Sequence, residues 1–457
     1  MHAGDVRTIE DVRRIVEATE AEFVTVGLVD TQGMLRGKYL SRRKFLSALD
    51  HGLGIPAVTL GLDFNDVIAE NAKVSDADRG YYDALVRVVP DSCRVIPWEP
   101  SGRDLFFQLE YADDTTAICP RNLLKRVLAR AEAMGLVPYT GVEYEFTLFH
   151  ETPTSLLEKG FKNLRLTTPY KTYYVLQRQS VWSEFYSAIM DMCRSMAIPL
   201  DTMHEEMGPG FMEATIAYGP GIRVADDAAI FKSYAKAAAQ RRDLIMTFMA
   251  RWSNGADGHS GHIHLSLRDK AGQPVLHDPA SPHGMSTIMR HAVGGMQKLM
   301  PELLLMLAPN VNSFKRLVPG IFAPTAAVWG VENRSCAIRV IPGEPTAQRI
   351  ECRTPGADAN PYFSIGALTA AGLWGIANKV EPDAAMTISA YGADIAPERR
   401  FPETFGAAIE RFRGSAVARE LFGAAFVDHY ADTRAWQDRE FRGLVTDREL
   451  ERFFELV

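Results

Sequence analysis

The first 110 residues alternate short apolar runs with polar turns. Residues 22–30 are rich in β-branched side chains, and residues 34–40 can return beside them as the second strand of a hairpin. Residues 41–50 have the spacing of a helix, with Ser41 placed to cap its first turn. Two further apolar runs, separated by prolines, lie at residues 84–89 and 105–109. The pattern predicts a small α+β unit.

The apolar periodicity lapses between residues 111 and 120, which predicts a domain boundary near residue 112. Pro120 suits the first turn of the next helix, and Gly135 suits its C-terminal cap. Longer helices are expected at residues 181–197 and 226–252, between segments that alternate like strands. The predicted domains are therefore residues 1–112 and residues 113–457.

Four short segments place charged side chains on one face of a strand and apolar side chains on the other. In residues 141–149, Glu143 and Glu145 alternate with valine, tyrosine and phenylalanine. Residues 204–213 carry carboxylates on either side of a Gly-Pro-Gly turn. The polar positions of the other two segments are His262, His264 and Ser266, and Arg349, Glu351 and Arg353.

Two interpretations of these faces are open. Each segment alone is typical of a solvated sheet face, and the four together could form a single sheet with one face exposed to solvent. Together they could instead form a site for divalent cations and phosphate, because oxygen ligands favour Mg²⁺ or Mn²⁺ and guanidinium groups match phosphate oxygens. The sequence has no Gly-x-x-x-x-Gly-Lys-[Ser/Thr] or Gly-x-Gly-x-x-Gly segment, so any nucleotide site must be of another kind.

Composition excludes several classes of protein. The formal net charge is −7, and no run of lysines and arginines is longer than three residues, which argues against nucleic-acid or anionic-membrane partners. The five cysteines are scattered, as expected for reduced thiols in a cytoplasmic protein. The most apolar run, residues 303–308, is too short to span a bilayer, and the first residues lack the apolar core of a signal peptide.

From about Val24 to its C-terminus the sequence resembles the glutamine synthetase family. The resemblance is clearest in Asn-Ser-Phe-Lys-Arg-Leu-Val-Pro-Gly at residues 312–320, and it continues through residues 329–339, 349–353 and 359–362. It implies an α+β fold, with a small N-terminal β-grasp-like domain before a large catalytic domain whose antiparallel sheet is flanked by helices. It also implies a homo-oligomer, a dodecamer of two hexameric rings.

The resemblance gives roles to the strand faces. Two or three Mg²⁺ or Mn²⁺ ions per active site would be held by six ligands: Glu143, Glu145, Glu205, Glu213, His262 and Glu351. ATP would contact Tyr218, His264, Ser266, Arg339 and Arg349. The other substrates would contact Asp257, Gly258, Arg316, Phe322 and Arg353. The catalytic arginines would be Arg316, Arg334 and Arg339.

The implied reaction is ATP-dependent amide formation through γ-glutamyl phosphate. Members of the family that use ammonia carry a glutamate where this chain has Phe322, and an aspartate in the region that matches residues 54–61, which has none here. Asp257 stands where the family usually has asparagine. These departures favour a γ-glutamyl-amine ligase for an aromatic or short alkyl amine, most like the γ-glutamylanilide or glutamate–isopropylamine ligases.

Two alternatives stay open at this point: an ordinary glutamine synthetase that uses ammonia, and a non-catalytic structural relative. Phe322 could also be a packing ring without substrate contact, and Asp257 could do the work of asparagine through its backbone. Residues 388–395 lack the Asn-Leu-Tyr-Asp-Leu-Pro segment of adenylylated members, so no adenylylation control is expected.

Overall fold

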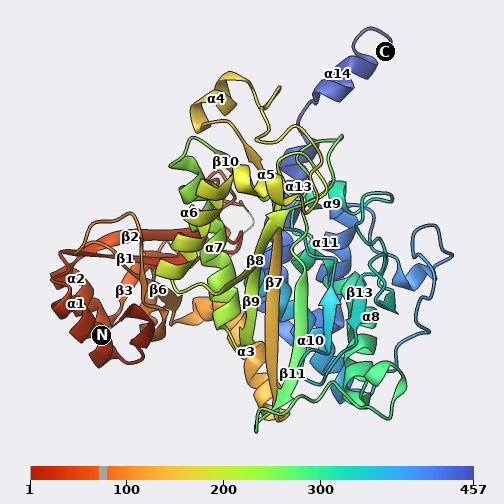
Figure 1. Cartoon of the computed structure of the whole chain (residues 1–457), viewed down its shortest axis with the longest axis horizontal. Coiled ribbons are helices and arrows are strands. Elements are labelled where there is room, and N and C mark those ends of the chain that lie inside the picture. The colour runs from red at the N-terminus through yellow and green to blue at the C-terminus, as the bar shows by residue number, and fades with distance from the viewer. Residues whose placement is uncertain (1, 71–79) are drawn as a thin grey trace.

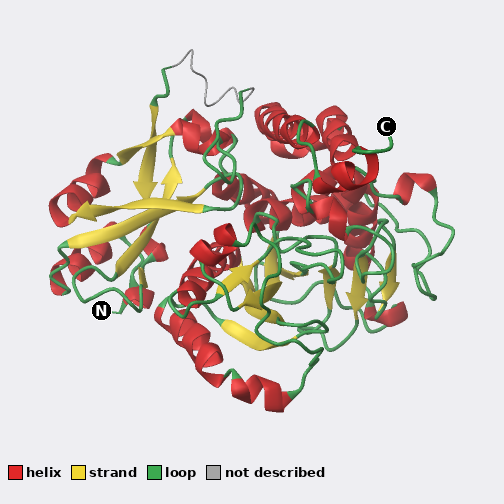
Figure 2. Cartoon of the chain, turned by 90° about the horizontal axis from the view of Figure 1, so that it is seen from above, coloured by secondary structure: helices red, strands yellow, loops and turns green. Residues whose placement is uncertain are grey.

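The computed structural model describes residues 2–70 and 80–457 and contains two sheets with helices around them (Figure 1, Figure 2). The N-terminal part holds strands β1 Phe23–Val29, β2 Leu35–Ser41, β3 Leu53–Pro56, β4 Asp83–Val88, β5 Arg94–Val95 and β6 Leu105–Tyr111, with helices α1 Ile9–Ala18 and α2 Arg42–His51. The strand order is β2-β1-β6-β4-β3, and β5 pairs with β6. Only the β1–β6 pair of this sheet is parallel among the described residues.

The expected hairpin and helix cap are both present in this sheet. Phe23 pairs with Ser41 and Val29 pairs with Leu35, so β1 and β2 are in register along their whole length. The Ser41 side chain accepts a hydrogen bond from the Lys44 backbone N–H at 3.4 Å, which satisfies one of the free donors of the first turn of α2.

The large sheet has eight strands in the order β12-β13-β14-β11-β7-β9-β8, with β10 paired to β7. Its strands are β7 Leu136–Phe149, β8 Leu200–Glu205, β9 Phe211–Pro220, β10 Ile245–Thr247, β11 Ile263–Asp269, β12 Trp329–Val331, β13 Ile338–Ile341 and β14 Arg349–Cys352. All pairs are antiparallel except β12–β13. The predicted α+β class, with an antiparallel sheet flanked by helices, is confirmed.

Helices cover one face of the large sheet (Figure 1, Figure 2). They pack on the apolar side of β7, where the Tyr144 ring stacks on Phe231 with an interplanar angle of 2°. The helices of this part are α3 Pro120–Ala133, α4 Pro153–Glu158, α5 Leu176–Val181, α6 Ser183–Ser195, α7 Arg223–Gln240, α8 Thr287–Leu307, α9 Ser313–Arg316, α10 Pro361–Ala377, α11 Phe405–Gly414, α12 Ala416–Phe422, α13 Ala424–Arg442 and α14 Asp447–Phe453. Because the apolar positions of β7 are buried here, Glu143 and Glu145 face the opposite side.

One of the two longer helices predicted for this part was wrong in extent. The helix expected at residues 226–252 ends at Gln240. Three residues later Asp243 has a left-handed φ of 55°, and the Leu244 N–H donates a hydrogen bond back to the Ala239 carbonyl. The next residues pair with β7 as strand β10. The helix expected at residues 181–197 is confirmed as α6, which spans Ser183–Ser195.

Buried polar contacts join the N-terminal residues to the large sheet and its helices. Arg94 pairs with Asp227 at 2.6 Å, and both side chains are fully buried. Gln108 donates to the Tyr362 hydroxyl at 3.0 Å, which in turn donates to Asp226 at 2.6 Å. The boundary near residue 112 stays a prediction. Within residues 2–70 and 80–457, no helix has both the length and the apolar character that crossing a membrane requires.

Candidate active site

A cavity of about 400 Å³ opens on the charged face of the large sheet. Strands β7, β9, β11 and β14 bring carboxylates and imidazoles to it. Most of the site residues expected from the sequence line this cavity: Glu143, Glu145, Glu213, Asp257, Gly258, His262, His264, Arg316, Phe322, Arg334, Arg339, Arg349, Glu351 and Arg353. The solvated-sheet interpretation fails here, because these groups converge instead of spreading over an open face.

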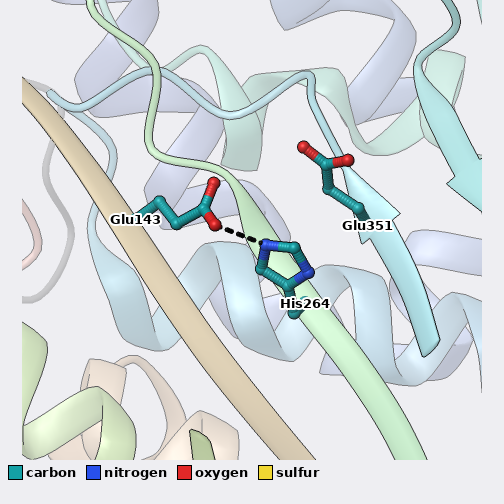
Figure 3. A group of neighbouring side chains, drawn as sticks. All are labelled: Glu143, His264 and Glu351. Carbon is teal, nitrogen blue, oxygen red and sulfur yellow. Dashed lines mark hydrogen bonds and ion pairs between the residues drawn. The ribbon is translucent and has the colours of Figure 1, made fainter. Parts of the chain in front are cut away.

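One carboxylate–imidazole cluster centres on Glu143 (Figure 3). Its carboxylate lies 2.9 Å from His264 Nε2 and 3.2 Å from His262 Nδ1. Glu351 lies opposite His264 in the antiparallel pair β11–β14, and its carboxylate is 3.6 Å from His262 Nδ1. His264 stands opposite Gly141, two residues before Glu143 on β7, so the cluster joins a directly opposite pair and a diagonal neighbour across three strands.

The electrostatics of this cluster keep two carboxylates charged. Burial disfavours the charged form of Glu143, but hydrogen bonds from His262 and His264 hold the pKa of its carboxyl below the ordinary value. Burial opposes ionisation of Glu351 as well, and the neighbouring His262 and Arg353 still lower its pKa. Both groups are therefore anionic acceptors at neutral pH.

A second cluster contains His204, Glu206 and Glu213. His204 Nε2 lies 3.1 Å from Glu206 and 3.8 Å from Glu213. Burial raises the pKa of the Glu213 carboxyl to about 9, and the negative charges of Glu143 and Glu145 add to the rise. Carboxylates crowded in this way lack a counter-charge, which a cation would supply.

Glu205 and Glu206 differ from the sequence expectation. Glu205 accepts a hydrogen bond from the Thr172 hydroxyl and does not line the cavity, whereas Glu206 does. Successive residues of an extended chain point to opposite faces, so Glu206 shares the side of His204 and Glu205 does not. The same alternation rule that identified Glu143 and Glu145 would have selected Glu206.

Tyr218 and Ser266 also lie outside the cavity lining. Ser266 stands opposite Tyr139 in the β7–β11 pair, and the Tyr218 ring lies 6.4 Å from the Tyr139 ring. Both lie farther along strands β9 and β11 than the two clusters. Their contacts with ATP stay predictions.

The arginines are held in place by backbone and carboxylate partners. Arg316 is buried and donates to the Thr354 carbonyl at 2.8 Å and the Arg353 carbonyl at 3.1 Å. Arg353 pairs with Glu351 at 2.5 Å, and Arg339 donates to the same carboxylate at 2.9 Å. Arg349 donates to His264 Nδ1 at 3.2 Å. Guanidinium groups fixed in this way form a rigid positive wall beside the acidic clusters.

Loops supply an apolar part of the lining, in which Phe322 was expected from the sequence and its apolar neighbours were not. Phe322 is 63% exposed, follows Ile321, and has a φ of 54°. The Tyr173 and Tyr174 rings lie 4.3 Å apart, and Tyr174 stacks on His204. Burial and the neighbouring Tyr173 and Glu206 raise the pKa of Tyr174 to about 12, so its hydroxyl keeps its proton at neutral pH. The lining residues that the sequence did not predict are Tyr173, Tyr174, Glu206, Met207, Phe211, Ser260 and Ile321.

The sequence profile of the glutamine synthetase catalytic domain matches residues 117–453. The chain belongs to the glutamine synthetase family. It is an ATP-dependent carbon–nitrogen ligase, as the sequence predicted, and enzymes of this family use divalent metal ions. The alternative of a non-catalytic structural relative is not supported, because the charged side chains line a single cavity.

Relatives within the family differ in the amine that their names specify. Type-1 glutamine synthetase 2 of Dictyostelium discoideum is 36% identical over 450 residues, which are 97% of this chain and 85% of that protein. The glutamate–isopropylamine ligase of a Pseudomonas species is 31% identical over 466 residues and 100% of both chains. The gamma-glutamylethanolamide synthetase of Streptomyces coelicolor is 33% identical over 449 residues, 98% of this chain and 96% of that one.

Solved structures support the fold. Apo GmaS superposes with a TM-score of 0.83 at 24% sequence identity, and the match covers 96% of this chain and 98% of the GmaS chain. The predicted resemblance to the family is thus confirmed in sequence and in fold.

Proposed function

We propose that this enzyme joins the γ-carboxylate of L-glutamate to an organic amine with an aromatic or short alkyl group, and that ammonia is a poor substrate. The observation that carries the proposal is the apolar lining formed by Ile321, Phe322, Tyr173 and Met207 beside the charged clusters. Phe322 takes the place at which ammonia-using relatives were expected to carry a glutamate. Relatives named for isopropylamine and ethanolamine ligation are consistent with this choice.

The donor set fits two divalent cations of the Mg²⁺ or Mn²⁺ type. Carboxylate oxygens with one imidazole suit these ions, and the raised pKa of Glu213 marks a place where a positive charge is missing. Glu145, Glu206 and Glu213 would hold one ion, and Glu143, His262 and Glu351 would hold the other. When bound, the ions supply positive charge that offsets the charge of the ATP phosphates.

The chain's own side chains then account for the two steps. Arg316 and Arg353 hold the carboxylates of glutamate. A γ-carboxylate oxygen forms a bond to the terminal phosphorus of ATP as the bond to ADP breaks, which gives γ-glutamyl phosphate. Arg334, Arg339 and Arg349 face the negative charge of the group in transfer, where fixed positive groups stabilise the transition state most.

In the second step the amine nitrogen attacks the acyl carbon, and inorganic phosphate leaves with the electron pair of the C–O bond. The attacking amine must lose one proton, which passes to the departing phosphate or to water. A neutral aromatic amine needs the least help from a base.

An apolar lining distinguishes amines by the surface that they bury. At about 25 cal/mol per Å², an amine that buries about 100 Å² of hydrocarbon against these side chains gains about 2.5 kcal/mol, a factor of roughly 70 in affinity. Ammonia gains nothing from such contacts. A polyamine would bring further positive charges against these apolar side chains, which cannot pair with them.

The test is a comparison of amines as third substrate. ADP release is measured with purified enzyme, L-glutamate and Mg-ATP, and ammonia, isopropylamine, aniline, ethanolamine and putrescine are added in turn. The proposal predicts the highest kcat/KM for aniline or isopropylamine. Ammonia as the best substrate by a wide margin would make the enzyme an ordinary glutamine synthetase.

We also propose that the enzyme assembles as the dodecamer of two hexameric rings that its family implies. Helix α14 projects from the body of the chain (Figure 1), and its apolar side chains near residues 450–457 are exposed. Burial against a second copy would remove this surface from water. Mass photometry of the full chain should give a mass of twelve copies of the 50.7 kDa chain, and a monomer at micromolar concentration would contradict the proposal.

A further inference from the structure

A second cavity of about 540 Å³ lies apart from the active site and shares none of its lining residues. Several parts of the chain enclose it: the turn between β1 and β2, Phe64, helix α7, strand β10 with the residues after it, residues 310–312, Asp358 and the C-terminal half of α13. Its walls are mostly apolar, and the apolar members are Met34, Leu35, Phe64, Met246, Phe248, Met249, Val311 and Phe441.

Two lysines one helical turn apart give this cavity a positive end. Lys232 and Lys236 both lie on α7, and their ammonium groups are 5.7 Å and 5.6 Å from the centroid of the Phe248 ring. Neither lysine has an ion pair in the part of the chain that the structure describes. Lys236 is exposed at the rim, whereas Lys232 is buried.

The contacts of Lys232 leave one of its donors unused. Its ammonium donates to the Ala357 carbonyl at 2.6 Å and the Ala359 carbonyl at 3.3 Å, and an ammonium has three N–H groups. Burial lowers the pKa of Lys232 to about 7, and the charge of Lys236 adds to this effect. A bound anion would stabilise both positive charges.

One carboxylate, Asp358, lines the cavity, and one of its oxygens is buried without a hydrogen-bond partner among the described residues. Asp358 accepts hydrogen bonds from Asn310 at 2.9 Å and from Ser313 at 2.6 Å. The lining therefore offers two cationic groups against one acid. A ligand amine would meet two like charges. No arginine belongs to the lining, so the site lacks the forked donors that favour phosphate.

We infer that this cavity is a second small-molecule site, for a monocarboxylate with an aromatic or branched apolar body. The carboxylate lies at Lys232 and Lys236, and the apolar body lies against Phe248, Met246 and Val311. The inference does not depend on which amine the active site uses.

Calorimetric titration of the full-length enzyme with 2-naphthoate tests the inference, with 2-naphthamide as the neutral isostere and 2-naphthylmethylamine as the cation. We expect saturable binding of 2-naphthoate, at least tenfold tighter than that of the other two compounds. Saturating L-glutamate and Mg-ATP should leave the affinity unchanged, because the active site has a separate lining. No saturable binding, displacement by glutamate, or preference for the amide or the amine would overturn the inference.

Substitutions locate the site. Lys236→Gln, at the exposed rim, should weaken 2-naphthoate binding at least fivefold without altering the fold. Lys232→Met should weaken it further where the variant remains folded. Lys298→Gln is the matched control, since Lys298 is another exposed lysine over an aromatic ring, 5.5 Å from the centroid of Trp374, outside the cavity. Equal affinities for Lys236→Gln and Lys298→Gln would overturn the placement.

Discussion

The two parts of the active-site lining are built in opposite ways. The charged part comes from neighbouring strands, where Glu143, His264 and Glu351 lie close together and Glu143 is hydrogen-bonded to His264. The apolar part comes from loops, where Phe322 and Tyr173 are substantially exposed. A sheet fixes positions to fractions of an ångström, while loops accept substitution. We infer that the strands determine the phosphoryl chemistry and that the loops determine the amine.

The largest effect is expected where the strands supply charge. Glu351→Gln should lower kcat by roughly 10³-fold, because the amide cannot offset Arg339 and Arg353 or hold a cation. Glu332→Gln is the control: Glu332 also pairs with Arg339 but is half exposed, and roughly tenfold or less is expected because solvent screens such pairs. ADP release at saturating isopropylamine measures both. Equal losses would show that Arg339 alone matters.

Substitutions at the neighbouring residues Glu205 and Glu206 test which of the two belongs to the charged part of the lining. Glu206→Gln should lower kcat by roughly 10²-fold and weaken Mn²⁺ binding at least tenfold, because it removes a charged ligand from the cavity. Glu205→Gln should mainly reduce stability, by about 1–2 kcal/mol, since its partner is the Thr172 hydroxyl. Calorimetric Mn²⁺ titration and thermal unfolding separate the two. The reverse ranking would restore Glu205 as the ligand.

The loop part is tested by Phe322→Glu. A carboxylate at this position should attract ammonium and repel a hydrocarbon, so the ratio of kcat/KM for ammonia to that for isopropylamine should rise at least tenfold, about 1.4 kcal/mol. Phe161→Glu is a close control, because Phe161 is 64% exposed with a φ of 58° and lies outside the cavity. An unchanged amine ranking in Phe322→Glu would remove Phe322 from the amine site.

The smallest effect concerns stability without metal. The folded-state pKa of Glu213 is raised to about 9 from an ordinary value of 4.5, so the folded protein holds a proton that the unfolded chain releases. Stability therefore falls as pH rises from about 4.5 to about 9. In EDTA, Tm should be a few degrees lower at pH 8.5 than at pH 6, and Mn²⁺ should remove the difference. Glu213→Gln should show a shallower slope, and an unaltered slope would contradict this account.

The contrast between strand and loop residues also explains which parts of the site could be predicted from the sequence. Alternation along β7 and β11 identified Glu143, Glu145, His262 and His264. Side chains two residues apart on a strand point to the same face of the sheet, so their spacing in the sequence predicts which of them lie together. Glu205 was expected as a ligand from the family resemblance, whereas the cavity is lined by Glu206, which follows the last residue of β8. Tyr173 and Tyr174 lie in an irregular segment without periodicity, so no pattern placed their rings beside His204.

One helix boundary failed for a related reason. Residues 244–250 are mostly apolar after the charged residues 241–243, and periodicity alone did not separate the end of α7 from the short strand that pairs with Thr147. Tertiary pairing with β7 outweighs local helix preference there. By contrast, the β1–β2 hairpin and the Ser41 cap depend on local chemistry, and both were predicted correctly.

Direct competition between amines tests the central claim most simply. The enzyme is incubated at pH 7.5 with L-glutamate, Mg-ATP and equal concentrations of isopropylamine and ammonium. The two amide products are quantified by mass spectrometry at low conversion. The account predicts that γ-glutamylisopropylamide exceeds glutamine at least tenfold. Glutamine as the main product would contradict it.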